Sequence, residues 1–129
     1  MTASAAKSYL ARLIAEHAGA LLFVLGLLVA AGGATTAGVV LLVVGAGLFT
    51  ASVVLGALSA VGVRAPGARM FGPGSIAAEV NRLTGWWYVE EAASVLGLPE
   101  RTLRNWLRAS VIATAVAFAA VPIVAIVRG

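Results

Sequence analysis

Residues 18–63, AGALLFVLGLLVAAGGATTAGVVLLVVGAGLFTASVVLGALSAVGV, run for 46 positions without one charged side chain. The only interruption is a cluster of small residues at 32–36, Gly-Gly-Ala-Thr-Thr. A bilayer core of about 30 Å needs about 20 apolar residues in an α-helix, and lipid forces a backbone to satisfy its own hydrogen bonds. The stretch therefore predicts a hairpin of two membrane-spanning helices, which are antiparallel because the turn between them is short.

The predicted spans reach the required length in different ways. Residues 39–63 are long enough alone, and we place the second span at about 38–63. The run before the turn is shorter, but apolar residues recur upstream at helical spacing and extend the first span to about 9–32: Tyr9, Leu10, Leu13 and Ile14. A third uncharged run over 109–127 predicts a third span at 109–129.

The composition agrees with a membrane protein and argues against an enzyme. Of the 129 residues, 61% are hydrophobic and 11% are charged, with a mean hydropathy of +1.03, whereas an average soluble domain carries about 25% charged residues. The chain has one histidine, His17, and neither cysteine nor aspartate, so it lacks the residue sets for metal binding and nucleophilic catalysis. We expect no catalytic residue, no metal site and no cofactor.

Small residues recur at four-residue spacing in the second and third predicted spans. This spacing lets helix backbones approach closely in lipid, where packing drives association. The small residues of the second span are Gly45, Gly47, Ala51, Gly56 and Ala60, among which Gly47 and Ala51, and Gly56 and Ala60, form pairs at this spacing; those of the third span are Ala109, Ala113 and Ala117. They fit packing against a neighbouring span of this chain and packing against another subunit, and the pattern does not choose between the two.

Residues 64–108, between the second and third spans, predict a small helical module at the membrane surface. Prolines and glycines predict a turn-rich loop over 64–75. Ser75 is placed to cap a short helix over 76–84, in which Glu79 falls on the outward, polar face.

An aromatic cluster follows this short helix: Trp86, Trp87 and Tyr88. Aromatic residues concentrate at the level of the lipid headgroups. We therefore favour anchoring at the membrane interface over stacking on a ligand or a nucleic-acid base.

Residues 88–108, YVEEAASVLGLPERTLRNWLR, predict a helix, a tight turn at Gly97 and a second helix. The stretch resembles the helix-turn-helix of excisionase and MerR-type DNA-binding proteins. The residues that match the first helix and its turn are Glu91, Ala92, Ala93, Leu96 and Gly97, and those that match the second, recognition helix are Thr102, Leu103, Trp106 and Arg108. The resemblance covers about 21 of the 129 residues. It implies a helix-turn-helix fold for this segment and contact with DNA through its second helix.

Three arginines, Arg101, Arg104 and Arg108, recur at i, i+3 and i+7 and so share one face of the second helix. Guanidinium groups in this arrangement suit phosphates, either those of DNA or those of lipid headgroups beside a span. Residues 64–108 have a net charge of only +2, from six Arg and four Glu. Because a span follows at once, we favour the membrane interface for these arginines.

The distribution of positive charge predicts an orientation in the membrane. Eight of the nine Lys and Arg residues lie on the side of the amino terminus and the 64–108 module, and one, Arg128, lies on the other. By the positive-inside rule we expect the amino terminus inside and the carboxyl terminus outside, in a cell membrane or a virion membrane.

The sequence thus predicts an all-α fold of three transmembrane helices with a helix-turn-helix-like surface module. The expected partners are the lipid bilayer and other membrane protein subunits, with nucleic acid as the less favoured choice. We favour a non-catalytic structural or accessory subunit of a larger membrane assembly. A membrane-tethered DNA-binding protein and a holin-like oligomeric pore are the alternatives.

Overall fold

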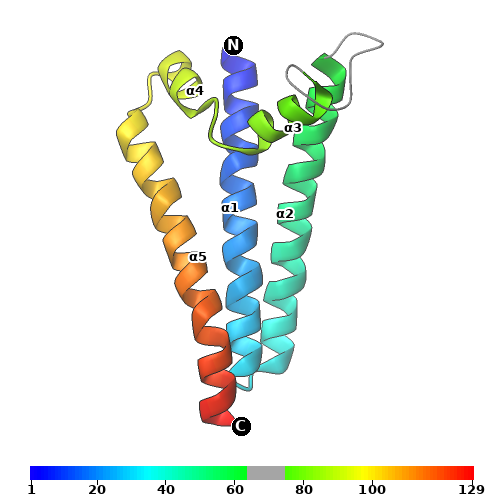
Figure 1. Ribbon diagram of the computed structural model, residues 1–129, viewed down its shortest axis with the longest axis vertical. Helices are drawn as coiled ribbons and strands as arrows, with labels where there is room; N and C mark the ends of the chain where they lie inside the picture. Colours follow the sequence, from blue (N-terminus) through cyan, green and yellow to red (C-terminus); the bar gives the residue numbers. More distant parts are fainter. Residues whose placement is uncertain (64–74) are drawn as a thin grey trace. The chain divides into compact units, whose positions relative to one another are not determined.

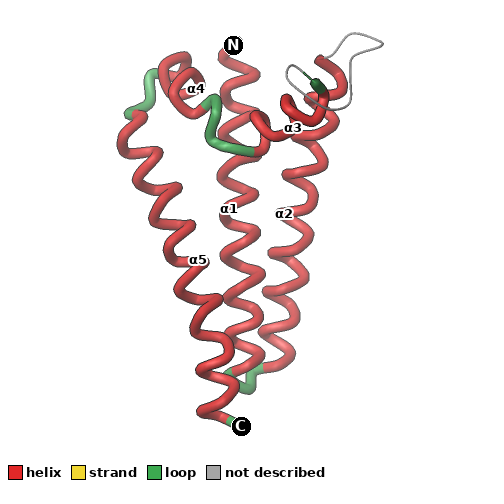
Figure 2. The backbone as a smooth tube through the Cα atoms, in the orientation of Figure 1, coloured by secondary structure: helices red, strands yellow, loops and turns green. Residues whose placement is uncertain are grey.

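A computed structural model of the chain describes residues 1–63 and 75–129, without the side chains of residues 60–63. These residues form helices with short connections and no strand (Figure 1, Figure 2). The helices are α1 (Ala3–Ala31), α2 (Thr35–Val63), α3 (Ile76–Thr84), α4 (Val89–Leu96) and α5 (Glu100–Arg128). The all-α prediction is confirmed. The predicted loop at 64–74 lies outside the described residues, as does the side chain of the predicted packing residue Ala60.

Three helices are long and apolar enough to cross a membrane: α1, residues 35–59 of α2, and α5. Each of α1 and α5 has 29 residues, which at 1.5 Å per residue corresponds to about 43 Å. The first helix begins at Ala3, earlier than the expected span, and α5 runs from the helix-turn-helix-like segment through the third apolar run without a break.

The chain divides into two compact units. Unit 1 comprises residues 1–14 and 51–104, and unit 2 comprises residues 15–50 and 105–129. Unit 1 therefore holds α3, α4 and the first turns of α1, and unit 2 holds the turn between α1 and α2 and most of α5.

In unit 2, the turn between α1 and α2 is built on Gly33, whose φ of 104° favours glycine. The Gly33 N–H donates to the Ala30 carbonyl at 3.0 Å and the Ala34 N–H donates to the Val29 carbonyl at 3.2 Å. This is the hydrogen-bond pattern of a Schellman helix end, which satisfies carbonyls that the helix leaves open. The chain reverses here, as the two adjacent apolar runs predict.

Glycines let α1 and α2 of unit 2 pack backbone against backbone. Gly19 and Gly26 of α1 face Gly45 and Gly38 of α2, respectively. A β-carbon on Gly26 would lie 2.5 Å from the Leu42 nitrogen and 2.6 Å from the Gly38 oxygen, and one on Gly45 would collide with the backbone of α1. The two glycines of each helix are seven residues apart, so they lie two turns apart on one face.

The core of unit 1 forms between the first turns of α1 and α4. Its buried apolar residues are Ala6, Tyr9, Leu10, Leu13, Val89, Ala92 and Ala93. The predicted cap of α3 is present, since the Ser75 hydroxyl accepts a hydrogen bond from the Ala78 N–H at 3.2 Å. The first helix of the helix-turn-helix-like segment, α4, ends at Leu96 and is followed by Gly97 with a φ of 66°, the left-handed turn that the sequence predicts.

Candidate functional site

Tyr9 of α1 is the centre of unit 1, with only 1% of its surface exposed. Its hydroxyl donates a hydrogen bond to the Gly85 carbonyl and accepts one from the Tyr88 N–H at 3.3 Å. The Tyr88 ring meets the Tyr9 ring edge to face, with centroids 5.8 Å apart, a favourable geometry for aromatic pairs. One side chain of the first predicted span thereby fixes the connection between α3 and α4.

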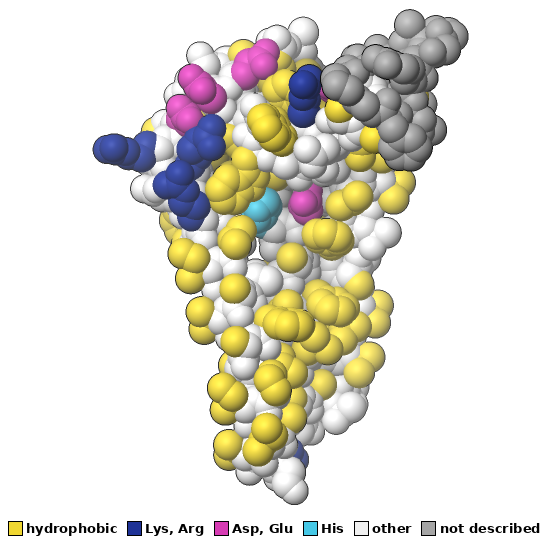
Figure 3. Space-filling view, viewed as in Figure 1, with side chains coloured by type: hydrophobic (Ala, Val, Ile, Leu, Met, Phe, Trp, Pro, Cys, Tyr) yellow, Lys and Arg dark blue, Asp and Glu magenta, His cyan; other side chains and the backbone are white. Residues whose placement is uncertain are grey.

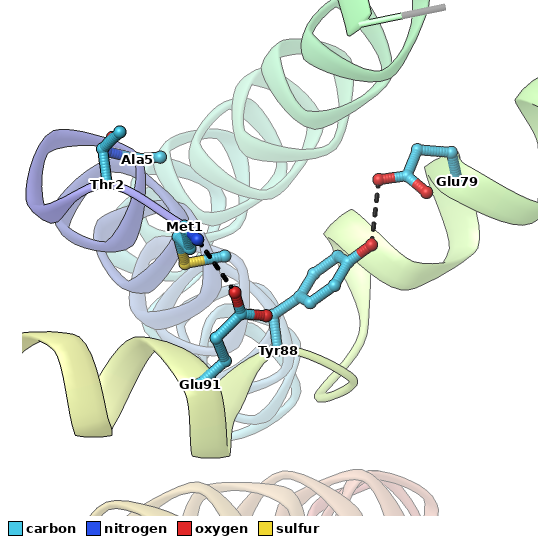
Figure 4. Close-up of polar contacts among 6 residues, drawn as sticks. All are labelled: Met1, Thr2, Ala5, Glu79, Tyr88 and Glu91. Carbon is cyan, nitrogen blue, oxygen red and sulfur yellow. Dashed lines mark hydrogen bonds and ion pairs between the residues drawn. The ribbon is translucent and has the colours of Figure 1, made fainter.

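Tyr88 extends this junction to α3. Its hydroxyl donates to Glu79 Oε1 at 3.0 Å (Figure 4), and Arg82 Nη1 lies 3.9 Å from Glu79 Oε2. Glu79 is only 8% exposed, so the prediction that it faces outward is wrong. The Tyr88 hydroxyl and the Arg82 guanidinium offset the free-energy cost of removing the Glu79 carboxylate from water. Burial, followed by the hydrogen bond to Glu79, raises the pKa of Tyr88.

Two further polar contacts hold the start of α1 in unit 1. The amino group of Met1 lies 3.0 Å from Glu91 Oε1 of α4 (Figure 4). Arg12 Nη1 donates to the Ser59 hydroxyl of α2 at 3.1 Å. Together with the Tyr9 contacts, these bonds make the first turns of α1 the element on which the module of unit 1 is assembled.

The three residues of the predicted aromatic cluster lie in different environments. Trp87 is 68% exposed. Trp86 and Tyr88 are partly buried, and the Tyr88 ring belongs to the Tyr9 junction. The sequence identified the cluster, but it held no sign of the tyrosine partner about 80 positions earlier in the chain.

The three predicted arginines also differ. Arg104 Nε donates to Glu100 Oε1 at 2.6 Å, one turn earlier in α5, and is partly buried. Arg101 and Arg108 are exposed. Glu100 therefore partly neutralises one of the three positions that could contact phosphates.

The predicted packing residues of α2 lie in different environments. Gly45 packs against α1, and Gly56 is buried, where a β-carbon would lie 3.2 Å from Thr84 Cγ2 of α3. Gly47 has no described atom within 4 Å of such a β-carbon, and Ala51 is exposed. Gly19 and Gly26, which sequence reasoning missed, are in the tightest part of the hairpin; their seven-residue spacing, repeated in α2, was the available signal.

On α5, the predicted ridge of small residues is mostly open. Ala117 is buried, whereas Ala109 and Ala113 are exposed. The same helix exposes large apolar side chains to more than half of their surface, among them Ile112, Val116 and Phe118.

A groove in unit 2 is a second feature that sequence reasoning missed. It has a volume of about 400 Å³ and is lined by Glu16, His17, Ala20, Val24, Phe49, Val111, Thr114, Ala115 and Phe118. Figure 3 shows the histidine side chain at the surface among hydrophobic side chains. Its lining residues come from three helices, so no local pattern in the sequence predicts the groove.

The described residues contain no group of three His, Cys, Asp or Glu side chains placed to hold a metal ion. No protein-family model, no curated protein and no solved structure matches the chain.

Proposed function

We propose that this chain is a non-catalytic subunit, structural or accessory, of a larger membrane assembly in a cell or virion membrane. One observation supports this most directly. In the most apolar window of α5 only 6% of the residues are buried within the chain, against 22% for α1 and 17% for α2. A helix with so few contacts in its own chain has most of its surface available to lipid and to other proteins.

The open ridge of α5 favours a protein partner on part of that surface. Between helices in lipid, association depends on close packing, which small side chains permit. Ala109 and Ala113 supply small, exposed positions one turn apart. Large apolar side chains on the remaining surface suit contact with lipid tails.

The orientation is part of the same proposal. Eight of the nine Lys and Arg residues lie on the side that we place inside, and only Arg128 lies outside. The exposed Trp87, Arg101 and Arg108 then lie at or near the inner headgroups.

Purification in a mild detergent tests the subunit role. The tagged full-length chain should retain a partner, or further copies of itself, in fixed stoichiometry. The variant Ala113→Leu should lose this association because it fills the ridge, while Ala119→Leu, the same change at an exposed position away from the ridge, should keep it. A monodisperse monomer from the native membrane would contradict the proposal.

A membrane-tethered DNA-binding protein is the second candidate, and one observation favours it: Arg101 and Arg108 are exposed on the helix that resembles a recognition helix. Titration of the solubilised protein with duplex DNA at two salt concentrations separates the candidates. Three phosphate contacts give a log–log salt slope of about −2.7, which a triple alanine variant at Arg101, Arg104 and Arg108 should lose. If the subunit role alone is correct, neither protein binds DNA.

A further inference from the structure

The groove of unit 2 has one polar end and one apolar end. Arg128, at the end of α5, donates to the Gly32 carbonyl, just after the end of α1, at 2.6 Å. The two helices therefore run in the same direction within unit 2. Glu16 lies 16 residues before Gly32 and Val111 lies 17 residues before Arg128, so they mark the same end of the groove. Val24 and Phe118 mark the other end.

Glu16 gives the polar end a negative group. Its side chain lines the groove beside His17, and α5 adds the hydroxyl of Thr114. Among the described parts of the chain, no hydrogen bond or ion pair involves the Glu16 carboxylate. A carboxylate in an apolar helix is costly without a partner, and such a residue points to a ligand or a functional contact.

α5 brings a positive group to the same end. Arg108 precedes Val111 by three residues and Ala115 by seven, so the three lie on one face of the helix. The arginine is exposed, one turn beyond the groove lining. A guanidinium binds phosphate well through paired hydrogen bonds. At the polar end, the Glu16 carboxylate can therefore accept hydrogen bonds from a cation, and the Arg108 guanidinium can donate hydrogen bonds to a phosphate.

The apolar part of the groove offers a surface for hydrocarbon chains. The other lining residues include Ala20, Val24, Phe49, Ala115 and Phe118, whose side chains are all apolar. A second hollow of about 290 Å³ shares Ala20, Val24 and Phe49 with the first and is otherwise lined by Phe23, Ala46 and Thr50. Two adjoining, mostly apolar hollows beside one charged group match the first parts of two acyl chains better than a single-tailed molecule.

We propose that this groove binds a phospholipid with a primary ammonium headgroup, of the phosphatidylethanolamine class. The Glu16 carboxylate accepts hydrogen bonds from the ammonium, Arg108 contacts the phosphate, and the acyl chains lie along Phe49 and Phe118. The site requires only that the chain reside in a lipid bilayer, and it stands whether or not the chain is a subunit of an assembly.

Native mass spectrometry of the full-length protein in detergent tests the site with lipids that share the same acyl chains. At equal concentrations, phosphatidylethanolamine should be retained about tenfold more than phosphatidylcholine, because a quaternary ammonium cannot donate hydrogen bonds to a carboxylate. Retention should fall stepwise through the mono- and dimethylated headgroups, a comparison that needs no variant.

Single-residue variants test whether the headgroup preference arises in this groove. Glu16→Gln should remove the headgroup preference while both lipids still bind, and Glu90→Gln, at an exposed position of α4, should keep it. Ala115→Phe should lower the retention of every lipid, whereas Ala119→Phe, at an exposed position outside both the lining and the ridge of small residues, should not.

Three results would overturn the proposal. They are equal retention of the two headgroups by the wild type, a preference that persists in Glu16→Gln, and displacement of phosphatidylethanolamine by an equimolar isoprenoid quinone. The last would assign the groove to a neutral headgroup.

Discussion

Tyr88 links α1 and α3 of unit 1 through its backbone N–H, its ring and its hydroxyl. The N–H and the ring meet Tyr9 of α1, and the hydroxyl meets Glu79 of α3. Removing the Tyr88 hydroxyl leaves the buried Glu79 carboxylate with one hydrogen-bond donor fewer. The Tyr88→Phe variant should therefore lose about 1–3 kcal/mol of unfolding free energy.

Thermal unfolding in detergent, followed by circular dichroism, checks this expectation. Trp87→Phe is the matched control, since Trp87 is largely exposed and its replacement should change the stability by about 0.5 kcal/mol or less. Equal melting temperatures for Tyr88→Phe and the wild type would show that the hydroxyl contact does not stabilise the fold.

The raised pKa of Tyr88 makes a separate prediction about alkaline pH. Burial, then the contact with Glu79, favours the neutral phenol in the folded protein. Its contribution to stability is therefore fully present below about pH 10, the ordinary tyrosine pKa, and is lost as the pH rises through the higher folded value. The difference in tyrosinate absorbance between wild type and Tyr88→Phe should titrate above pH 10; a midpoint at or below about 10 would contradict the buried junction.

At the scale of elements, the contact between α1 and α2 depends on where a glycine lies rather than on how many there are. Gly45 and Gly47 are two residues apart on α2, yet only Gly45 lies against the α1 backbone. Gly45→Leu should destabilise the hairpin by about 1–3 kcal/mol through overpacking, while Gly47→Leu should have a small effect on folding. Unfolding of both variants in the same detergent compares them directly, and equal losses would contradict this packing face.

The helices themselves were largely predictable because their signals are local. Uncharged runs indicate the long helices, the Ser75 cap marks the start of α3, and Gly97 marks the end of α4. Contacts between distant positions were not predictable in this way. Tyr9 reads as one more apolar residue of a span, Glu79 reads as a solvent-facing charge, and the groove beside Glu16 exists only when three helices meet.

At the scale of the whole molecule, the proposed topology has three membrane crossings. Three helices are long and apolar enough to cross, and the charge distribution proposes which side each connection occupies. The turn before α2 and the segment containing α4 should then lie on opposite sides of the membrane.

Because the chain has no cysteine, single introduced cysteines can report on which side of the membrane each segment lies, without labelling elsewhere in the chain. Single cysteines at Thr36, in the first turn of α2, and at Ser94, in α4, are both at exposed positions. In sealed vesicles of known orientation, a membrane-impermeant maleimide should label Ser94→Cys only from the inner side and Thr36→Cys only from the outer side. Labelling of both cysteines from the same side would contradict the three-span arrangement.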